Sequence, residues 1–212
     1  MKLVGMLDSP YVRRVAVSLQ LLGQPFEHQS LSVFSTFDQF HRINPVVKAP
    51  SLVCDDGTVL MDSTLILDYA ESLAAPGKSL MPIGIAERFH ALRIIGLALA
   101  ACEKSVQIFY ERMLRPAEKQ HEPWVSRVTG QLLAAYGALE SDIEREPLAV
   151  ASNTINQAGV SIAVAWRFTQ MVVPELAPAR LFPLLRQFSI QAESLPEFAA
   201  APHGSSTYPH GV

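Results

Sequence analysis

The sequence is poor in cysteine and in charged residues. Only two of its 212 residues are cysteines, and 17% are charged. Cys54 and Cys102 both lie in apolar surroundings, which favours buried free thiols over a disulfide framework. Six histidines are scattered, and none stands at metal-binding spacing from a cysteine or a carboxylate. We therefore expect neither a structural disulfide nor a metal.

An excess of positive charge and long hydrophobic runs are also missing. Lys and Arg total 17 against 20 Asp and Glu, a net charge of -3, so no basic stripe is available for a nucleic-acid backbone. The most apolar helix-like run, residues 94–102, is far shorter than the roughly 20 residues that span a bilayer. No basic region with a cleavage site opens the chain. We expect a soluble, cytoplasmic protein without nucleic-acid or membrane partners.

What is present is ample core material, since 49% of the residues are hydrophobic. Short apolar runs alternate with helical spacing in the first part of the chain, which predicts a small mixed α/β domain over residues 1–76. Proline and glycine then crowd a linker at about 77–84. Beyond it only helical patterns recur, which predicts an all-helical domain over residues 85–212. The expected strands are 2–7, 26–31, 51–54 and 58–61, and the expected helices are 10–22, 37–43, one opening at Asp62-Ser63, 85–114, 124–145, 155–173 and 180–195, with a short turn at 196–200 and an irregular tail at 202–212.

The segment Lys48–Tyr69 combines a hairpin with the start of a helix. Asp56-Gly57 predicts a two-residue turn between the strands. Ser63 is a favourable N-cap, and a helix start attracts anions through its unpaired N–H groups. A small zwitterion could place its carboxylate on Ser63 and its ammonium on Asp62. From the residues alone, an ordinary hairpin followed by a capped helix is the favoured interpretation.

Three other helix starts are readable. Ser9 follows the first strand and precedes Pro10, as an N-cap does. Thr36-x-x-Gln39 has the capping-box pattern. Asn156 is an N-cap whose flanking Ile155 and Val160 are spaced for a hydrophobic staple, and Gly159 leaves its capping box incomplete.

Four motifs in order resemble the cytosolic glutathione transferases over nearly the whole chain. Residues 9–15, Ser-Pro-Tyr-Val-Arg-Arg-Val, resemble the first loop and helix of that family. Residues 44–52, Asn-Pro-Val-Val-Lys-Ala-Pro-Ser-Leu, resemble its N-P-x-x-K-V-P-x-L segment, with Ala49 where Val is usual. Asp62-Ser63 and residues 155–160 resemble its acidic-Ser pair and its helical capping motif, the latter with Asn156 for Ser or Thr and Gly159 for Asp. The resemblance implies a thioredoxin-like N-terminal domain with a cis proline at Pro50.

The resemblance also implies a detoxifying transferase with glutathione as co-substrate and no metal. Ser9 would donate a hydrogen bond to the glutathione thiolate, the reactive form of the thiol. Ser at this position, rather than Cys, points to conjugation instead of mixed-disulfide chemistry. The neighbouring Asp8 would oppose a thiolate unless its side chain turns away. The implied glutathione-binding residues are Ser9, Tyr11, Lys48, Ala49, Pro50, Asp62 and Ser63.

A small hydrophobic electrophile is expected between the two domains, as in the family, and a homodimer is expected. The candidate walls for the electrophile are Tyr11, Phe34, Val106, Tyr110, Met113 and Trp166, each of which could equally serve core or subunit packing. Two alternatives stay open: a non-catalytic binding or regulatory module, and glutathione-dependent peroxide reduction, isomerisation or dehalogenation on the same scaffold.

Overall fold

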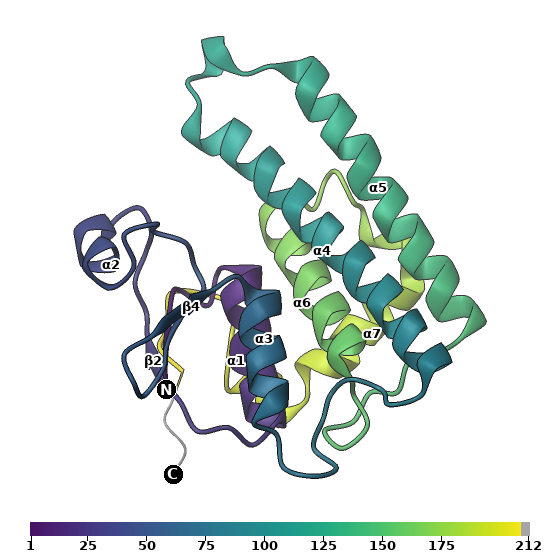
Figure 1. Ribbon diagram of the computed structural model, residues 1–212. Coiled ribbons are helices and arrows are strands. Elements are labelled where there is room, and N and C mark those ends of the chain that lie inside the picture. Colours follow the sequence, from purple (N-terminus) through teal and green to yellow (C-terminus); the bar gives the residue numbers. More distant parts are fainter. Residues whose placement is uncertain (209–212) are drawn as a thin grey trace. The chain divides into compact units, whose positions relative to one another are not determined.

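The computed structural model describes residues 1–208, which fall into two compact units. The first unit contains Met1–Met81 and the described residues from Ser194 on, and the second contains Pro82–Glu193. Figure 1 shows the strands confined to the first unit and the long helices α4, α5 and α6 to the second. Within residues 1–208 no helix is both long and apolar enough to cross a bilayer.

The first unit is built on a four-stranded sheet in the order β2-β1-β3-β4. Its strands are β1 (Lys2–Val4), β2 (Glu27–Gln29), β3 (Ser51–Val53) and β4 (Val59–Met61). β1 runs parallel to β2 and antiparallel to β3, and β3 pairs antiparallel with β4. All four strands lie inside the ranges expected from sequence, and β1, β3 and β4 are short, mainly apolar runs, whereas β2 is the polar segment Glu-His-Gln.

Three helices cover this sheet: α1 (Pro10–Leu21), α2 (Phe37–Ile43) and α3 (Ser63–Ser72). α1 and α3 pack against each other, and both helices bury apolar side chains, among them Val15, Leu19 and Ile66. Phe40 of α2 packs separately with Val4 and Leu31. The mixed sheet with these helices confirms the predicted thioredoxin-like unit.

Three local predictions in the first unit are wrong. The hairpin was predicted to turn over two residues, but its turn has three, Asp55-Asp56-Gly57. Cys54 N–H donates to the Thr58 carbonyl across the turn, and Gly57 N–H donates to the Cys54 carbonyl. Gly57 has φ +86°, which a glycine adopts readily. Thr36 is not a side-chain cap, since its hydroxyl accepts from Ser32 N–H at 2.7 Å and donates to the Ser32 carbonyl at 3.0 Å.

The third concerns α3, whose N-cap is Asp62 rather than Ser63. The Asp62 carboxylate accepts from Thr64 N–H at 2.9 Å, and Ser63 is already the first helical residue. A carboxylate is as good a cap as a hydroxyl, and sequence alone did not decide between two adjacent candidates.

The second unit consists of α4 (Ile85–Leu114), α5 (Glu122–Arg145), α6 (Gln157–Val172) and α7 (Pro183–Glu193), with 3₁₀ turns η1 (Ala117–Lys119) and η2 (Ala179–Leu181). α4 packs along both α5 and α6, and α7 packs on α5 and α6. α6 is buried along most of its length. Its N-cap is Asn156, whose side chain accepts from Gly159 N–H at 3.0 Å, as predicted.

Two further expectations differ from the structure. The helix expected from residue 180 begins at Pro183, because a residue that precedes proline avoids the helical region, and Phe182 has φ -134° and ψ 64°. The short helix α8 (Pro196–Ala199) and the residues after it lie with the first unit rather than with the helical one. An irregular tail was expected at 202–212, and residues 209–212 of that range lie outside the described residues.

Candidate functional site

Ser9 stands where β1 has ended and α1 begins. Its backbone is extended and its hydroxyl accepts from Val12 N–H at 3.4 Å, which confirms the predicted N-cap. The bond is long, so the hydroxyl is only weakly engaged. Its N–H donates to the Met6 carbonyl at 3.1 Å, which folds residues 6–9 into a turn. Ser9 therefore combines a half-buried hydroxyl with the positive end of a twelve-residue helix.

Asp8 introduces negative charge immediately before Ser9. Burial raises the pKa of its carboxyl above the ordinary value, and the charge of His203 and the N–H groups of Ser9 and Asp8 work in the opposite direction. The nearby His203 gives this carboxylate a potential counter-charge, supplied by the C-terminal part of the first unit.

Gly5 brings the first loop close to the segment that contains Ala49. It has φ +136°, and a Cβ placed on it would lie 2.5 Å from a Val12 methyl group and 3.2 Å from the Ala49 Cβ. Any other residue would push α1 or Ala49 away. Sequence reasoning did not single out Gly5, although a glycine at the end of a strand signals such an approach.

The Ala49–Pro50 peptide bond is cis, as the resemblance implied. The loop before it is held by Asn44, a buried side chain whose amide donates to Ser51 Oγ at 2.8 Å and whose carbonyl oxygen accepts from Val46 N–H at 3.0 Å. Ser51 Oγ in turn donates to the Lys48 carbonyl at 2.8 Å. The position of the Ala49 backbone thus depends on Asn44 and Ser51, to which the sequence had assigned no role.

Ser63 and Thr64 contact a buried cation at the start of α3. Arg14, only 3% exposed, donates from Nη1 to Ser63 Oγ at 3.1 Å and to Thr64 Oγ1 at 3.2 Å. Since Ser63 Oγ accepts from Arg14, its own proton is directed elsewhere and can serve a bound anion. Arg14 stands in the motif that carried the family resemblance, yet nothing in the sequence indicated this contact.

Asp62 has an unusual backbone and a charged neighbour. Its φ of 73° is uncommon for a residue other than glycine and indicates a local constraint of the kind that clusters at binding sites. Its second carboxylate oxygen lies 3.4 Å from Lys48 Nζ, and both side chains are about half exposed. The arrangement presents a carboxylate beside a hydroxyl and a buried guanidinium, which suits a ligand that carries both charges.

The predicted electrophile residues occupy different environments within their own units. In the first unit Tyr11 is half-buried and Phe34 is exposed. In the second, Val106 is half-buried, while Tyr110 and Met113 are exposed.

Trp166, the remaining predicted electrophile residue, belongs to the core of the helical unit. It is 3% exposed, and its ring packs edge-on against Tyr136 and Phe182 with centroid distances of 5.1 and 5.7 Å. A ring that is enclosed in this way has little surface left for a ligand.

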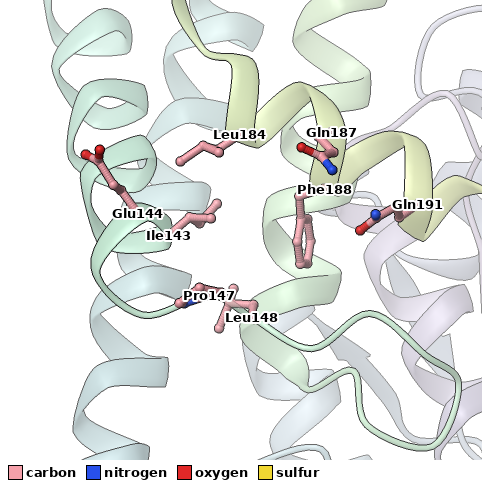
Figure 2. A pocket seen from close by; sticks show the side chains of 8 residues that line it. All are labelled: Ile143, Glu144, Pro147, Leu148, Leu184, Gln187, Phe188 and Gln191. Carbon is pink, nitrogen blue, oxygen red and sulfur yellow. The ribbon is translucent and has the colours of Figure 1, made fainter.

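The helical unit also contains a pocket of about 350 Å³ between the end of α5, the two residues Pro147 and Leu148, and α7 (Figure 2). Its walls are mainly the apolar side chains of Ile143, Leu148, Leu184 and Phe188. Of the residues that line it, Glu144 alone is ionisable, and Figure 2 shows its carboxylate turned away from the Phe188 ring. This pocket therefore lacks the combination of a buried cation and a hydroxyl found at the start of α3 in the first unit. Within residues 1–208 no group of three or more His, Cys, Asp or Glu is arranged to hold a metal ion.

These features define a two-unit protein with a thioredoxin-like sheet and a helical second part. Residues 3–78 match the family model described as glutathione S-transferase, N-terminal domain. The chain is 28% identical to the uncharacterised glutathione-transferase-like protein YibF of Escherichia coli K12, over 78% of this chain and 80% of that protein.

Two solved structures extend the likeness. A glutathione transferase family member from Pseudomonas fluorescens Pf-5, crystallised with glutathione, is 30% identical, covers 94% of this chain and 97% of its own, and superposes with a TM-score of 0.82. A glutathione S-transferase from Methylobacterium radiotolerans, in complex with glutathione sulfonate, is 24% identical, covers 100% and 99% of the two chains, and shares the fold with a TM-score of 0.86. The chain belongs to the glutathione transferase family.

Proposed function

We propose that this protein is a glutathione transferase that binds glutathione on its first unit and uses Ser9 to stabilise the thiolate. The observation that carries the proposal is the anion site at the start of α3, where Arg14 lies beneath the Ser63 hydroxyl at 3.1 Å. Because Ser63 Oγ accepts from Arg14, its own proton can donate to a bound carboxylate, and the guanidinium adds positive potential at the start of α3.

In this proposal the γ-glutamyl group and the cysteinyl backbone of glutathione bind to two different segments of the first unit. The γ-glutamyl carboxylate accepts from Ser63 at the N-terminus of α3, and the ammonium pairs with Asp62. The cysteinyl backbone pairs with the Ala49 main chain next to cis-Pro50, in the manner of an added strand. Lys48, whose Nζ lies 3.4 Å from Asp62, would contact the glycyl carboxylate, and Tyr11 would lie near the peptide.

The chemical step requires a thiolate near Ser9. The thiol proton leaves to water, and the sulfur is then stabilised by the Ser9 hydroxyl and by the positive end of α1. The sulfur lone pair forms the new C–S bond, and the leaving group departs with its bonding electrons, as halide in the case of an aryl halide. Each unit carries candidate contacts for a small hydrophobic electrophile: Tyr11 and Phe34 in the first, and Val106, Tyr110 and Met113 in the second, with Trp166 enclosed in the core.

Binding is tested by retention on immobilised glutathione. We expect Ser63→Ala and Arg14→Gln to be retained much less than the wild type, because the first removes the donor and the second the charge beneath it. Ser72→Ala, at the exposed other end of α3, is the matched control. If the two site variants are retained like the control, the assignment of the anion site is wrong.

Turnover is tested with a generic aryl halide and an organic peroxide. We expect conjugation by the wild type and a loss of about 10²-fold in kcat for Ser9→Ala, since one preorganised donor to an anionic centre has roughly that worth. Reduction of the peroxide alone would identify a peroxidase on the same site. Retention on glutathione without any turnover would identify a binding or regulatory module and contradict the proposal.

The same proposal includes a homodimer. The first unit exposes Met61, Leu65 and Tyr69 along β4 and α3, and the second exposes Ile83, Ile85, Phe89 and Leu92 around the start of α4. Apolar surface of this extent on each unit fits a second copy of the chain better than water.

A cytoplasmic, detoxifying role follows from the proposed co-substrate, because the glutathione pool keeps the cytosol reducing and the two cysteines are free thiols.

A further inference from the structure

The C-terminal segment 201–208 is fastened to the first unit by polar contacts that bridge about 180 residues of sequence. Arg13, only 1% exposed, donates from Nε to the Ala201 carbonyl at 2.6 Å. Ser30 donates from Oγ to the Ser205 carbonyl at 2.9 Å. In Figure 1 this segment, drawn in yellow, runs beside α1 and β2.

His28 of β2 makes the most informative of these contacts. It is buried, its Nδ1 lies 2.7 Å from the Tyr208 backbone N, and its Nε2 lies 2.7 Å from the Gly5 carbonyl. A backbone N–H can only donate and a carbonyl can only accept, so the two partners require a neutral ring with its proton on Nε2. The Tyr208 ring also packs on Phe26 at a centroid distance of 4.8 Å. The imidazole therefore joins the C-terminal segment to Gly5.

Gly5 is the residue from which the loop that contains Ser9 departs. Its surroundings are tight, because any Cβ would collide with Val12 and crowd Ala49, and its N–H is fixed to the Gln29 carbonyl at 3.1 Å. With the N–H and the carbonyl of Gly5 both bonded to β2, little freedom remains in the direction of the chain toward Ser9. His203 of the same C-terminal segment influences Asp8 in this loop, which gives the segment a second approach to it.

We propose that His28 is a positioning residue for the proposed reaction: it transmits the docking of the C-terminal segment at Tyr208 to Gly5 and so holds the first loop with the Ser9 hydroxyl in its working place. This inference rests on the function proposed above. His28 touches neither the sulfur nor the electrophile. Its contribution is the fixed orientation of a group whose displacement by about 1 Å can cost up to about 10² in rate.

The test uses two pairs of variants in the full chain. His28→Phe keeps a ring of similar size and removes both hydrogen bonds, whereas His28→Gln retains one donor and one acceptor. Tyr208→Pro removes the N–H and the ring, whereas Tyr208→Ala removes the ring alone. We expect kcat to fall about tenfold in His28→Phe and Tyr208→Pro, with the KM for glutathione nearly unchanged because the docking residues Asp62 and Ser63 lie elsewhere. His28→Gln and Tyr208→Ala should remain close to the wild type.

Three kinetic results would overturn the inference: a kcat equal to that of the wild type in all four variants, an equal loss of kcat in His28→Phe and His28→Gln, or a rise in KM with kcat unchanged. Amide hydrogen exchange over residues 6–9 gives a readout that does not need turnover, and it should accelerate in His28→Phe and Tyr208→Pro only. A wild-type protein without activity would thus refute the proposed function, while unchanged exchange in these two variants would refute the coupling.

Discussion

Among single residues, Asp8 has the charge that most directly opposes the proposed thiolate. Replacing Asp8 with Asn removes this charge, so the thiol of bound glutathione should ionise more readily. We predict that the acid limb of the kcat/KM–pH profile moves down by roughly half to one pH unit. Asp68→Asn, an exposed change on α3, is the control. An unmoved limb would show that the Asp8 carboxyl does not act on the sulfur.

Asp8 also affects how the stability of the protein depends on pH. Because burial raises the pKa of Asp8 in the folded protein, the folded state binds its proton more tightly than the unfolded state does. The free energy of unfolding contributed by this group therefore increases as the pH falls through the folded pKa and decreases as the pH rises. At neutral pH, Asp8→Asn should accordingly leave the melting temperature unchanged or raise it.

At this scale the sequence predicted residue types better than residue contacts. Ser9 as a cap is confirmed, because capping depends on the immediate neighbours in the chain, and the cis proline at Pro50 is confirmed as the family resemblance implied. Arg14 and Ser63 are 49 residues apart, and their hydrogen bond exists only because α1 and α3 pack side by side. No local pattern contains that information.

Among the structural elements, the start of α6 carries a testable exception to capping rules. Gly159 occupies the position where an acidic residue would complete a capping box, yet a Cβ there would lie 2.9 Å from Ile155 and 3.2 Å from the Phe188 ring of α7. We predict that Gly159→Asp destabilises the protein by about 1–3 kcal/mol instead of improving the cap, because it overpacks this contact. Thermal or urea unfolding measures the change.

Two further variants serve as comparisons for the stability of Gly159→Asp. Asn156→Ala removes the observed cap bond to Gly159 N–H and should cost about 1 kcal/mol. Gly130→Ala in α5 meets no atom within 4 Å and should raise stability by up to about 1 kcal/mol. Stabilisation by Gly159→Asp would mean that α6 and α7 separate easily, contrary to the packing described.

Element boundaries were predictable where hydrophobic periodicity or proline sets them. α4 spans Ile85–Leu114, the range that its periodicity indicated. The bounds of α2, Phe37–Ile43, were also predicted, but the predicted capping bond is absent because the Thr36 hydroxyl bonds to Ser32. Serine and threonine hydroxyls bond to nearby backbone in several competing ways, and the choice among them depends on the path of the loop.

For the whole molecule, the exposed apolar side chains of α4 predict self-association. Phe89 is 72% exposed on the first turns of α4. We predict that Phe89→Ser weakens a dimer by about tenfold or more, since a central aromatic side chain often contributes over 1 kcal/mol to an interface. Sedimentation equilibrium measures the dissociation constant. Ile190→Ser, which changes an exposed apolar residue of α7, is the matched control and should leave that constant unaltered.

The assignment of the C-terminal segment to the first unit was the part of the architecture least accessible from sequence. Composition changes at a Pro- and Gly-rich stretch, and that change indicated the boundary near residue 80. Residues 194–208 read as a continuation of the helical part, yet they belong to the first unit. The contacts that hold them, such as Arg13 to Ala201, join residues 188 apart and leave no periodic trace in either segment.

In the proposed complex, the ion pair between Lys48 and Asp62 would make ligand binding an exchange of cations. Lys48 Nζ lies 3.4 Å from the carboxylate that the ligand's ammonium would approach in the proposed complex. One ammonium replaces another there, so the Coulombic gain at Asp62 largely cancels and the displaced lysine becomes available to the far carboxylate of the tripeptide. In this proposal a compound without an amino group would offer Asp62 no cation in exchange for the lysine. Selection among ligands at this end of the site would therefore depend on how well a ligand's ammonium competes with the Lys48 ammonium for Asp62, more than on the strength of any single new contact.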